Sequence, residues 1–210
     1  MDILAGLKDK LRFIERHYET ASFPFREIRR KINASEEPFE PPPFDPENCD
    51  GEPPFLEEYL EATESLNIEG QAALKLVQSA LRKYLSSFVE MYGIPIKATG
   101  KNWIERYKKH FLETYSIDFD KAPVPLEQLE EVNFARNDLE HGEEPFGMSR
   151  RQSEEHAARF PGGLFVDELE KEVFQSDSSW PGQIVVTETN LEEAIRRVEQ
   201  FCEFVDGQRP

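Results

Sequence analysis

The chain has 210 residues, of which 38% are hydrophobic, and its sixteen phenylalanines are enough for one sizeable core. Its 42 acidic and 25 basic residues give a formal net charge of −17, and its fifteen prolines indicate that some of the chain lies outside that core. Cys49 and Cys202 are isolated, which excludes a disulfide framework, and no apolar run approaches membrane length. We therefore expect a soluble, cytoplasmic protein with no membrane partner.

Residues 1–33 are predicted to form an N-terminal helix or helix pair. Apolar residues recur there at alternating spacings of three and four, as in a heptad seam. They are Leu4, Leu7, Leu11, Ile14, Tyr18, Ala21, Phe25, Ile28 and Ile32. Pro24 lies within this stripe and is expected to kink or divide the helix. The stripe either packs on the protein's own bundle or forms a dimer seam.

Residues 34–54 are predicted to be an acidic, Pro-rich linker, because seven prolines exclude a regular helix or a central strand. Between Ile32 and Leu74 there are twelve acids and no Lys or Arg, so the rest of the chain carries 30 acids against 25 bases. A net charge of −5 for that remainder does not exclude an anionic ligand. Phe39, Phe44 and Phe55 suggest that the segment docks on the protein, with a flexible tether as the alternative.

Residues 55–210 are predicted to form one helical domain. A helix from Phe55 to Tyr92, with a break or bend near Asn67 to Gly70, has the strongest amphipathic pattern in its second half. Asn102 then resembles the N-cap of a helix that runs to about Tyr115.

Basic and aromatic residues alternate in and before that second helix, a composition that contacts phosphate backbones and stacks bases. The predicted RNA-binding residues are Lys97, Lys101, Trp103, Arg106, Lys108 and Lys109. The alternative is that the aromatic residues form a buried face and that the lysines are simply solvated.

A further helix begins at about Pro125 and is expected to stop at Gly142. Its spacing places Leu129, Val132, Ala135 and Leu139 on one apolar face. Asn137 and His141 lie four residues apart on another face, roughly opposite, and Arg136 lies on the shoulder between the two. One short element therefore presents a cation, an amide and a titratable imidazole.

Three short elements are expected after this helix. Ser149-x-x-Gln152 resembles a capping box that opens a helix to about Arg159. Residues 184–187 are a strand candidate. Thr189-x-x-Glu192 is the expected start of the last helix, which ends near Gly207. The predicted fold class is mainly α: a helical bundle with an acidic Pro-rich linker and a small β hairpin before the C-terminal helix.

The residues Arg136-Asn137-x-x-x-His141-Gly142 resemble the R-N-x-x-x-H-G signature of HEPN domains. These are small helical domains, many of them metal-independent endoribonucleases of prokaryotic toxin–antitoxin and defence systems. The resemblance implies a HEPN-like bundle that cleaves RNA as a homodimer with two motifs across a two-fold axis, and an antitoxin or other protein partner. It also implies catalytic roles for Arg136, Asn137 and His141, with no cofactor and no metal.

Other interpretations of these residues stay open. The same spacing occurs from Arg12 to His17 and from Arg151 to His156, although only the Arg136 match has a polar residue after the arginine and a glycine after the histidine. Arg136 also has the spacing for a surface ion pair with Glu140. His141 could cap the helix C-terminus. The chain would then be a non-catalytic helical module that binds a protein or a nucleotide.

Overall fold

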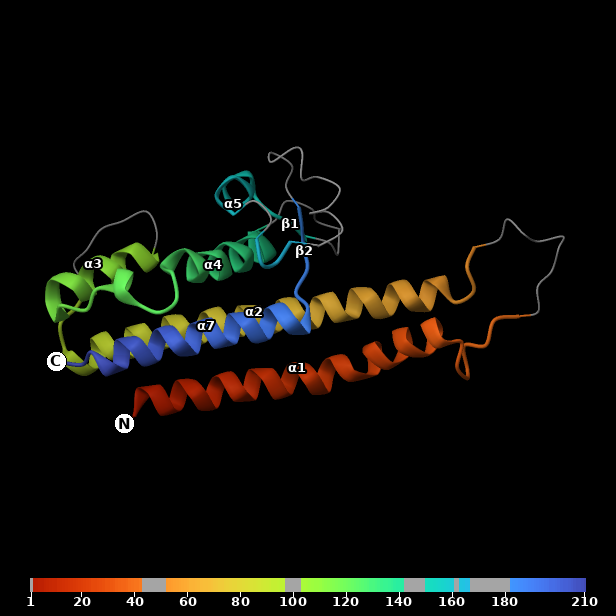
Figure 1. The fold of residues 1–210 in the computed structure, drawn as a ribbon, viewed down its shortest axis with the longest axis horizontal. Helices are drawn as coiled ribbons and strands as arrows, with labels where there is room; N and C mark the ends of the chain where they lie inside the picture. Colours follow the sequence, from red (N-terminus) through yellow and green to blue (C-terminus); the bar gives the residue numbers. More distant parts are fainter. Residues whose placement is uncertain (1, 43–51, 97–102, 142–149, 161–162, 167–181) are drawn as a thin grey trace.

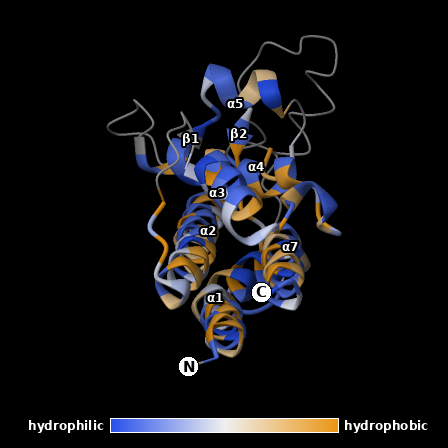
Figure 2. Cartoon of the chain, turned by 90° about the vertical axis from the view of Figure 1, so that its left-hand side faces the viewer, coloured by the Kyte–Doolittle hydropathy of each residue, from blue (hydrophilic) through white to orange (hydrophobic). Residues whose placement is uncertain are grey.

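The computed structural model describes residues 2–42, 52–96, 103–141, 150–160, 163–166 and 182–210, with only the backbone described for His141 and Arg150. As predicted, the fold is a mainly α-helical bundle. Three layers are visible in Figure 1 and, end-on, in Figure 2. Helix α1 (Ile3–Ala34) lies under α2 (Leu56–Tyr92) and α7 (Glu188–Gly207), while α3 (Trp103–Tyr115) and α4 (Leu126–His141) lie over their other face.

Helix α1 is continuous through Pro24, so of the two predicted outcomes, a kink or a division, the division does not occur. Asp2 caps its start, since Oδ1 accepts from the amides of Leu4 and Ala5, both at 3.1 Å. Near the proline, the Glu19 carbonyl accepts bonds from side chains further along the helix. The backbone hydrogen bond that Pro24 cannot donate would go to the Thr20 carbonyl, and the long packing surface against α2 offsets its loss.

The heptad stripe of α1 packs within the chain. Leu7, Leu11, Ile14 and Tyr18 are buried in the same core as residues of α2 and α7. Phe25, Ile28 and Ile32 are only half-buried, because α1 and α2 extend past the other helices at this end of the bundle. Burial decreases along the helix for lack of partners, although the apolar pattern continues.

Helix α2 is continuous from Asn67 to Gly70, so the break predicted there as an alternative to a bend does not occur. Gly70 serves a close approach instead: a Cβ there would lie 2.3 Å from the Val186 carbonyl oxygen and 2.8 Å from the Val186 Cβ. The segment that follows β2 therefore crosses α2 at a position where only glycine fits. At its start α2 has Phe55, whose ring meets Phe39 edge-on at 5.3 Å. Phe44 lies outside the described residues.

Helix α3 joins the bundle through aromatic contacts, and its bounds agree with the prediction. Phe111 is fully buried, with ring centroids 5.0 Å from Phe88 of α2 and 5.1 Å from Phe119. Phe119 begins a short 3-10 turn, η2 (Phe119–Lys121), and lies 4.8 Å from Phe201 of α7. One chain of ring contacts thus connects three helices.

The expected small β element exists as an antiparallel ladder. Strand β1 (Arg150–Arg151) pairs with β2 (Gln183–Ile184), and α5 (Glu154–Arg159) follows β1 directly. Helix α5 is capped by Ser153 and α7 by Thr187, so the boxes predicted at Ser149 and Thr189 are wrong. Residues 150–151 cannot begin a helix because they form the ladder. At α7, the hydroxyl of Thr187, two residues before Thr189, caps the start of the helix.

Helix α7 closes the core as predicted, with a fully buried apolar face. That face comprises Leu191, Ala194, Ile195, Val198, Phe201, Cys202 and Val205. The Tyr84 hydroxyl of α2 donates to the Cys202 carbonyl at 3.0 Å, and burial raises the pKa of the Cys202 thiol. Among the helices described, none combines the length and the apolar character needed to cross a membrane.

Candidate functional site

Helix α4 carries the predicted motif and is held by burial along most of its length. It follows Pro125, whose carbonyl accepts from the Gln128 amide at 3.0 Å. Its predicted apolar face is buried as expected: Leu129, Val132, Ala135 and Leu139 are at most 4% exposed. The motif thus sits on a rigid element of the core and not on a surface loop.

Arg136 and Asn137 lie side by side in the last turns of α4, both half-buried. The Arg136 guanidinium donates to Asn137 Oδ1 at 3.1 Å and forms an ion pair with Glu140 Oε1 at 2.7 Å. The side chains of Arg136 and Glu140 are 27% and 31% exposed. Solvent therefore reaches the pair, and an ion pair of this kind contributes only a few tenths of a kcal/mol.

His141 is the last described residue of α4. It lies one turn beyond Asn137 along the helix. The side chain of His141 and all of Gly142 are outside the described residues, so the predicted glycine stop and the imidazole's partners are not located. The structure thus brings Arg136 and Asn137 together and places the backbone of His141 at the same helix end.

Asp138, one residue after Asn137, points in a different direction and is buried. Its Oδ2 accepts from His156 Nδ1 at 2.7 Å and from the Ser153 amide at 2.9 Å. His156 is 1% exposed and packs against the rings of Phe134 and Phe160, at 5.6 and 5.7 Å. Its Nε2 has no hydrogen-bond partner within the described parts of the chain. The Asp138–His156 pair fastens α5 to α4. His156 is also the histidine of the alternative Arg151 match, so that match has a structural partner.

Two buried glutamates in the first half of α4 hold the same flanking region. Glu130 pairs with Arg159 of α5, and Glu131 Oε1 accepts from the Leu164 amide. Burial raises the pKa of Glu130, although Arg159 opposes that shift. Both carboxylates are less than a tenth exposed. They attach the segment after α5 to the bundle.

Asn133 joins three helices through one amide oxygen. Its Oδ1 accepts from the Trp103 indole N–H at 2.6 Å and from Gln78 Nε2 at 3.2 Å. Trp103 is therefore engaged inside the protein through its polar edge, while its ring remains half-buried. Sequence reasoning missed Asn133, Asp138 and His156 as structural groups. The only signal was the presence of polar residues next to the apolar stripe of α4, which does not reveal partners that are distant in sequence.

The basic residues of α3 differ in their partners. Lys108 pairs with Asp120 at 2.7 Å, and Lys109 approaches Glu113 at 3.8 Å. Arg106 is exposed. Tyr107 packs against Trp103 and Phe111. Lys97 and Lys101 are outside the described residues. The aromatic side chains of α3 thus pack toward the core, while Arg106 and Lys109 face solvent.

Within the described residues no group of three His, Cys, Asp or Glu side chains is placed to hold a metal ion. Comparison with protein families, with curated proteins and with solved structures finds no match for this chain.

Proposed function

We propose that this chain is a metal-independent endoribonuclease of the HEPN type. The observation that carries the proposal is the adjacent placement of Arg136 and Asn137, solvent-accessible and hydrogen-bonded, on the helix that ends at His141. A guanidinium and an imidazole are the groups that cleavage of RNA requires, because RNA supplies its own nucleophile, the 2′-hydroxyl.

Each residue has a distinct role in this proposal. His141 transfers a proton during attack of the 2′-hydroxyl on phosphorus, since an imidazole titrates near neutral pH. Arg136 binds the phosphate oxygens through its two-pronged guanidinium and stabilises the charge of the pentacovalent state. Asn137 orients the Arg136 guanidinium through the bond described above, or the histidine.

Glu140 competes with the phosphate for Arg136. The ion pair is partly exposed and weak, whereas a phosphate forms charge-assisted bonds with two guanidinium nitrogens. RNA binding is therefore expected to displace Glu140 from Arg136. A homodimer that brings two motifs together, and exposed cations such as Arg106 and Lys109 that contact the RNA backbone, complete the proposal. Action as a toxin or defence protein, with an antitoxin or other protein partner, belongs to the same proposal.

A second candidate is a non-catalytic helical module that binds a protein or a nucleotide. It is favoured by the same ion pair: both contacts of Arg136 described above, to Glu140 and to Asn137, are internal to α4. In that case Arg136 supports the helix end and meets no substrate.

RNA cleavage separates the two candidates. The full chain, verified as a dimer by sedimentation, is incubated with single-stranded RNA in EDTA and with the same sequence as DNA. The enzyme proposal expects RNA fragments ending in a 2′,3′-cyclic phosphate and expects the DNA to stay intact. A verified dimer that cuts no RNA overturns the enzyme proposal in favour of the binding module.

A further inference from the structure

A groove of about 420 Å³ runs between the start of α1 and the end of α2, on the opposite layer from α4. On α1 its lining includes Ile3, Gly6 and Leu7, and on α2 it includes Leu76, Ala80 and Tyr84. The groove exists because small residues face each other there: a Cβ on Gly6 would meet no atom within 4 Å. The two helices are thus in contact at their core and separated at their surface.

The other side of α1 is closed, which shows that the opening is specific to the α2 side. Lys8 forms ion pairs with Glu199, at 3.3 Å, and with Glu203, both on α7. These contacts join the surfaces of α1 and α7 along the same stretch. Comparable contacts do not cross the α1–α2 groove among the described residues.

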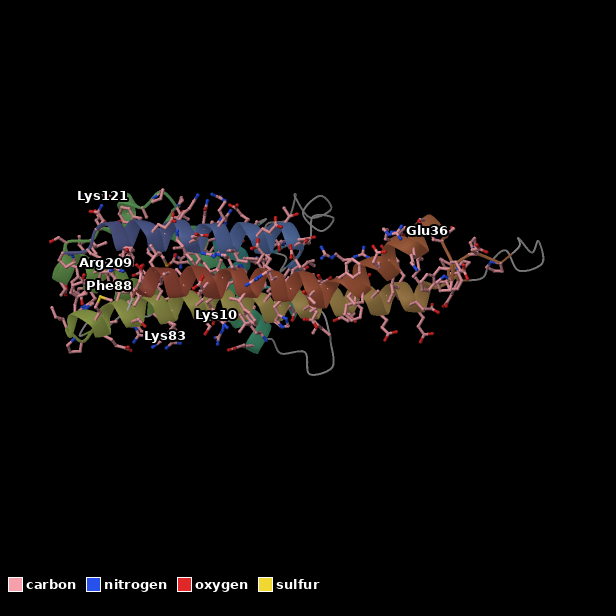
Figure 3. All side chains as sticks on the ribbon, turned by 90° about the horizontal axis from the view of Figure 1, so that it is seen from below. Lys10, Glu36, Lys83, Phe88, Lys121 and Arg209 are labelled. Carbon is pink, nitrogen blue, oxygen red and sulfur yellow. The ribbon has the colours of Figure 1, made fainter. Side chains whose placement is uncertain are left out.

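Two lysines flank the groove, one on each wall. Lys10 of α1 and Lys83 of α2 line it, and Figure 3 shows both on the α2 side of α1. Lys10 lies over the Phe13 ring at 5.0 Å and has no ion pair within the described residues. Lys83 reaches Glu90 only at 3.8 Å, with both side chains about two-thirds exposed or more. The groove therefore has a lysine on each wall, in a chain of net charge −17, while the acid in its lining, Asp2, caps the start of α1.

Apolar side chains continue the groove beyond its lining. Phe13 follows Gly6 and Lys10 at helical spacing on α1, and Ile68 precedes Ser79 at helical spacing on α2. These two side chains are 51% and 49% exposed. Because they adjoin an apolar groove, these residues enlarge the apolar surface that a partner could cover.

We propose that this groove binds an acidic amphipathic helix of a partner protein. Its lining on α2 spans Leu76 to Ser87, or about 16 Å and three helical turns at about 1.5 Å per residue. That length suits a helix with apolar residues at positions i, i+4 and i+7. Lysines on both walls fit a ligand with acids on both flanks of its apolar stripe, an arrangement that a single anionic head group does not provide.

The test uses three synthetic peptides with the full chain and fluorescence anisotropy as the readout. The first is a helix with leucines at i, i+4, i+7 and i+11 and glutamates on both flanks. The second replaces the glutamates by lysines, and the third scrambles the acidic sequence. The proposal expects saturable binding of the first alone. Binding of none of them, or equal binding of the acidic and basic helices, overturns it.

Variants of the protein locate the binding site. A Cβ at Gly6 meets no atom within 4 Å, so Gly6→Leu extends a side chain from open space into the groove and should weaken binding of the acidic helix by about tenfold or more. Lys83→Glu should weaken it by about fivefold to tenfold through lost attraction and added repulsion. Lys121→Glu makes the same charge change on the opposite side of α7 and should leave binding unchanged (Figure 3). Thermal melts establish that each variant is folded.

Two results at this stage contradict the proposal. Folded Gly6→Leu that binds the acidic helix as well as the wild type places the peptide elsewhere. If the wild-type chain is a dimer and Gly6→Leu is a monomer in sedimentation, a second copy occupies the groove and the partner-helix proposal is overturned. Neither result depends on RNA cleavage, so the two proposals fail separately.

Discussion

Two arginine-to-histidine matches of equal spacing have different surroundings in this molecule. Arg136 lies at the partly exposed end of α4, where its guanidinium is reached by solvent, donates to Asn137 and forms a weak ion pair with Glu140. His156 of the Arg151 match is buried and bonded to Asp138. Both pairs satisfy the same sequence pattern. Burial therefore separates a group that can meet a phosphate from a group that holds the fold.

The largest expected effect follows from the catalytic role proposed for the Arg136 match. His141→Ala should lower the rate of RNA cleavage by about 10² to 10⁴, the usual contribution of a general acid or base. Arg136→Ala should cost a comparable factor, since the charge of the pentacovalent phosphate loses its stabilisation. Single-turnover rates measure both effects, and circular dichroism should show a folded protein because Arg136 is outside the core.

His17→Ala is the matched control for this prediction. His17 follows Arg12 at the same spacing and is exposed on α1. Cleavage by this variant should equal that of the wild type. If His17→Ala lost cleavage activity while His141→Ala kept it, the proposal would have placed the chemistry at the wrong arginine–histidine match.

Substitution in the buried Arg151–His156 match should lower the stability of the protein and not the rate of cleavage. His156→Ala leaves Asp138 without its side-chain partner inside the protein, so the free energy of unfolding should fall by about 2 to 4 kcal/mol. Urea denaturation measures the change. A double-mutant cycle with Asp138→Ala should give a coupling energy well above zero. Additive effects of the two substitutions would show that the pair contributes nothing by itself.

The close approach of the segment after β2 to Gly70 of α2 predicts a smaller loss of stability. Gly70→Ala places a Cβ against the Val186 backbone and should destabilise the chain by about 1 to 3 kcal/mol. Gly6→Ala makes the same change in α1, where the new methyl meets nothing, and should stabilise the helix by about 0.5 to 1 kcal/mol. Melting temperatures that shift in the same direction for both variants would contradict the proposed close approach at Gly70.

The smallest effect concerns the dependence of stability on pH at Glu130. Burial raises the pKa of this carboxyl in the folded state, so its contribution to stability is present below the unfolded value of 4.5 and is lost as the pH rises through the folded value. Glu130→Gln should therefore become more stable relative to the wild type as the pH rises from 4.5, and the difference should then level off. Urea midpoints between pH 4 and about 8 measure it.

Glu127→Gln tests a second contribution to the same shift. Glu127 is an exposed carboxylate in the first turn of the same helix, and its charge adds to the burial that raises the pKa of Glu130. Its replacement should therefore lower the pH at which the contribution of Glu130 is lost. A constant difference between Glu130→Gln and the wild type over this range would contradict the raised pKa.

The sequence predicted the helices well where apolar periodicity alone defines them. The buried faces of α4 and α7 agree with the expected residues, because each face repeats at helical spacing over several turns. Helix ends were less predictable. Thr187 and Thr189 are both plausible caps, and only the course of the chain after β2 decides that Thr187 is used.

Single residues with two possible structural roles account for the other differences. Pro24 and Gly70 both predict interruption of a helix, yet packing keeps α1 and α2 continuous. Of the candidate site, the sequence predicted the helix and the adjacency of Arg136 and Asn137. It could not predict that Asp138, between Asn137 and Leu139, is paired with a histidine eighteen residues later, because a contact across that separation leaves no local pattern.

The buried thiol of α7 provides a probe of local opening. Alkylating reagents react with the thiolate, and Cys202 is both enclosed by the core and shifted toward the neutral thiol. In a chain with Cys49→Ser, labelling then requires α7 to separate from α2. The labelling rate at several reagent concentrations therefore gives the free energy of that separation, and its comparison with global unfolding shows whether α7 leaves the bundle alone or only with the rest of the fold.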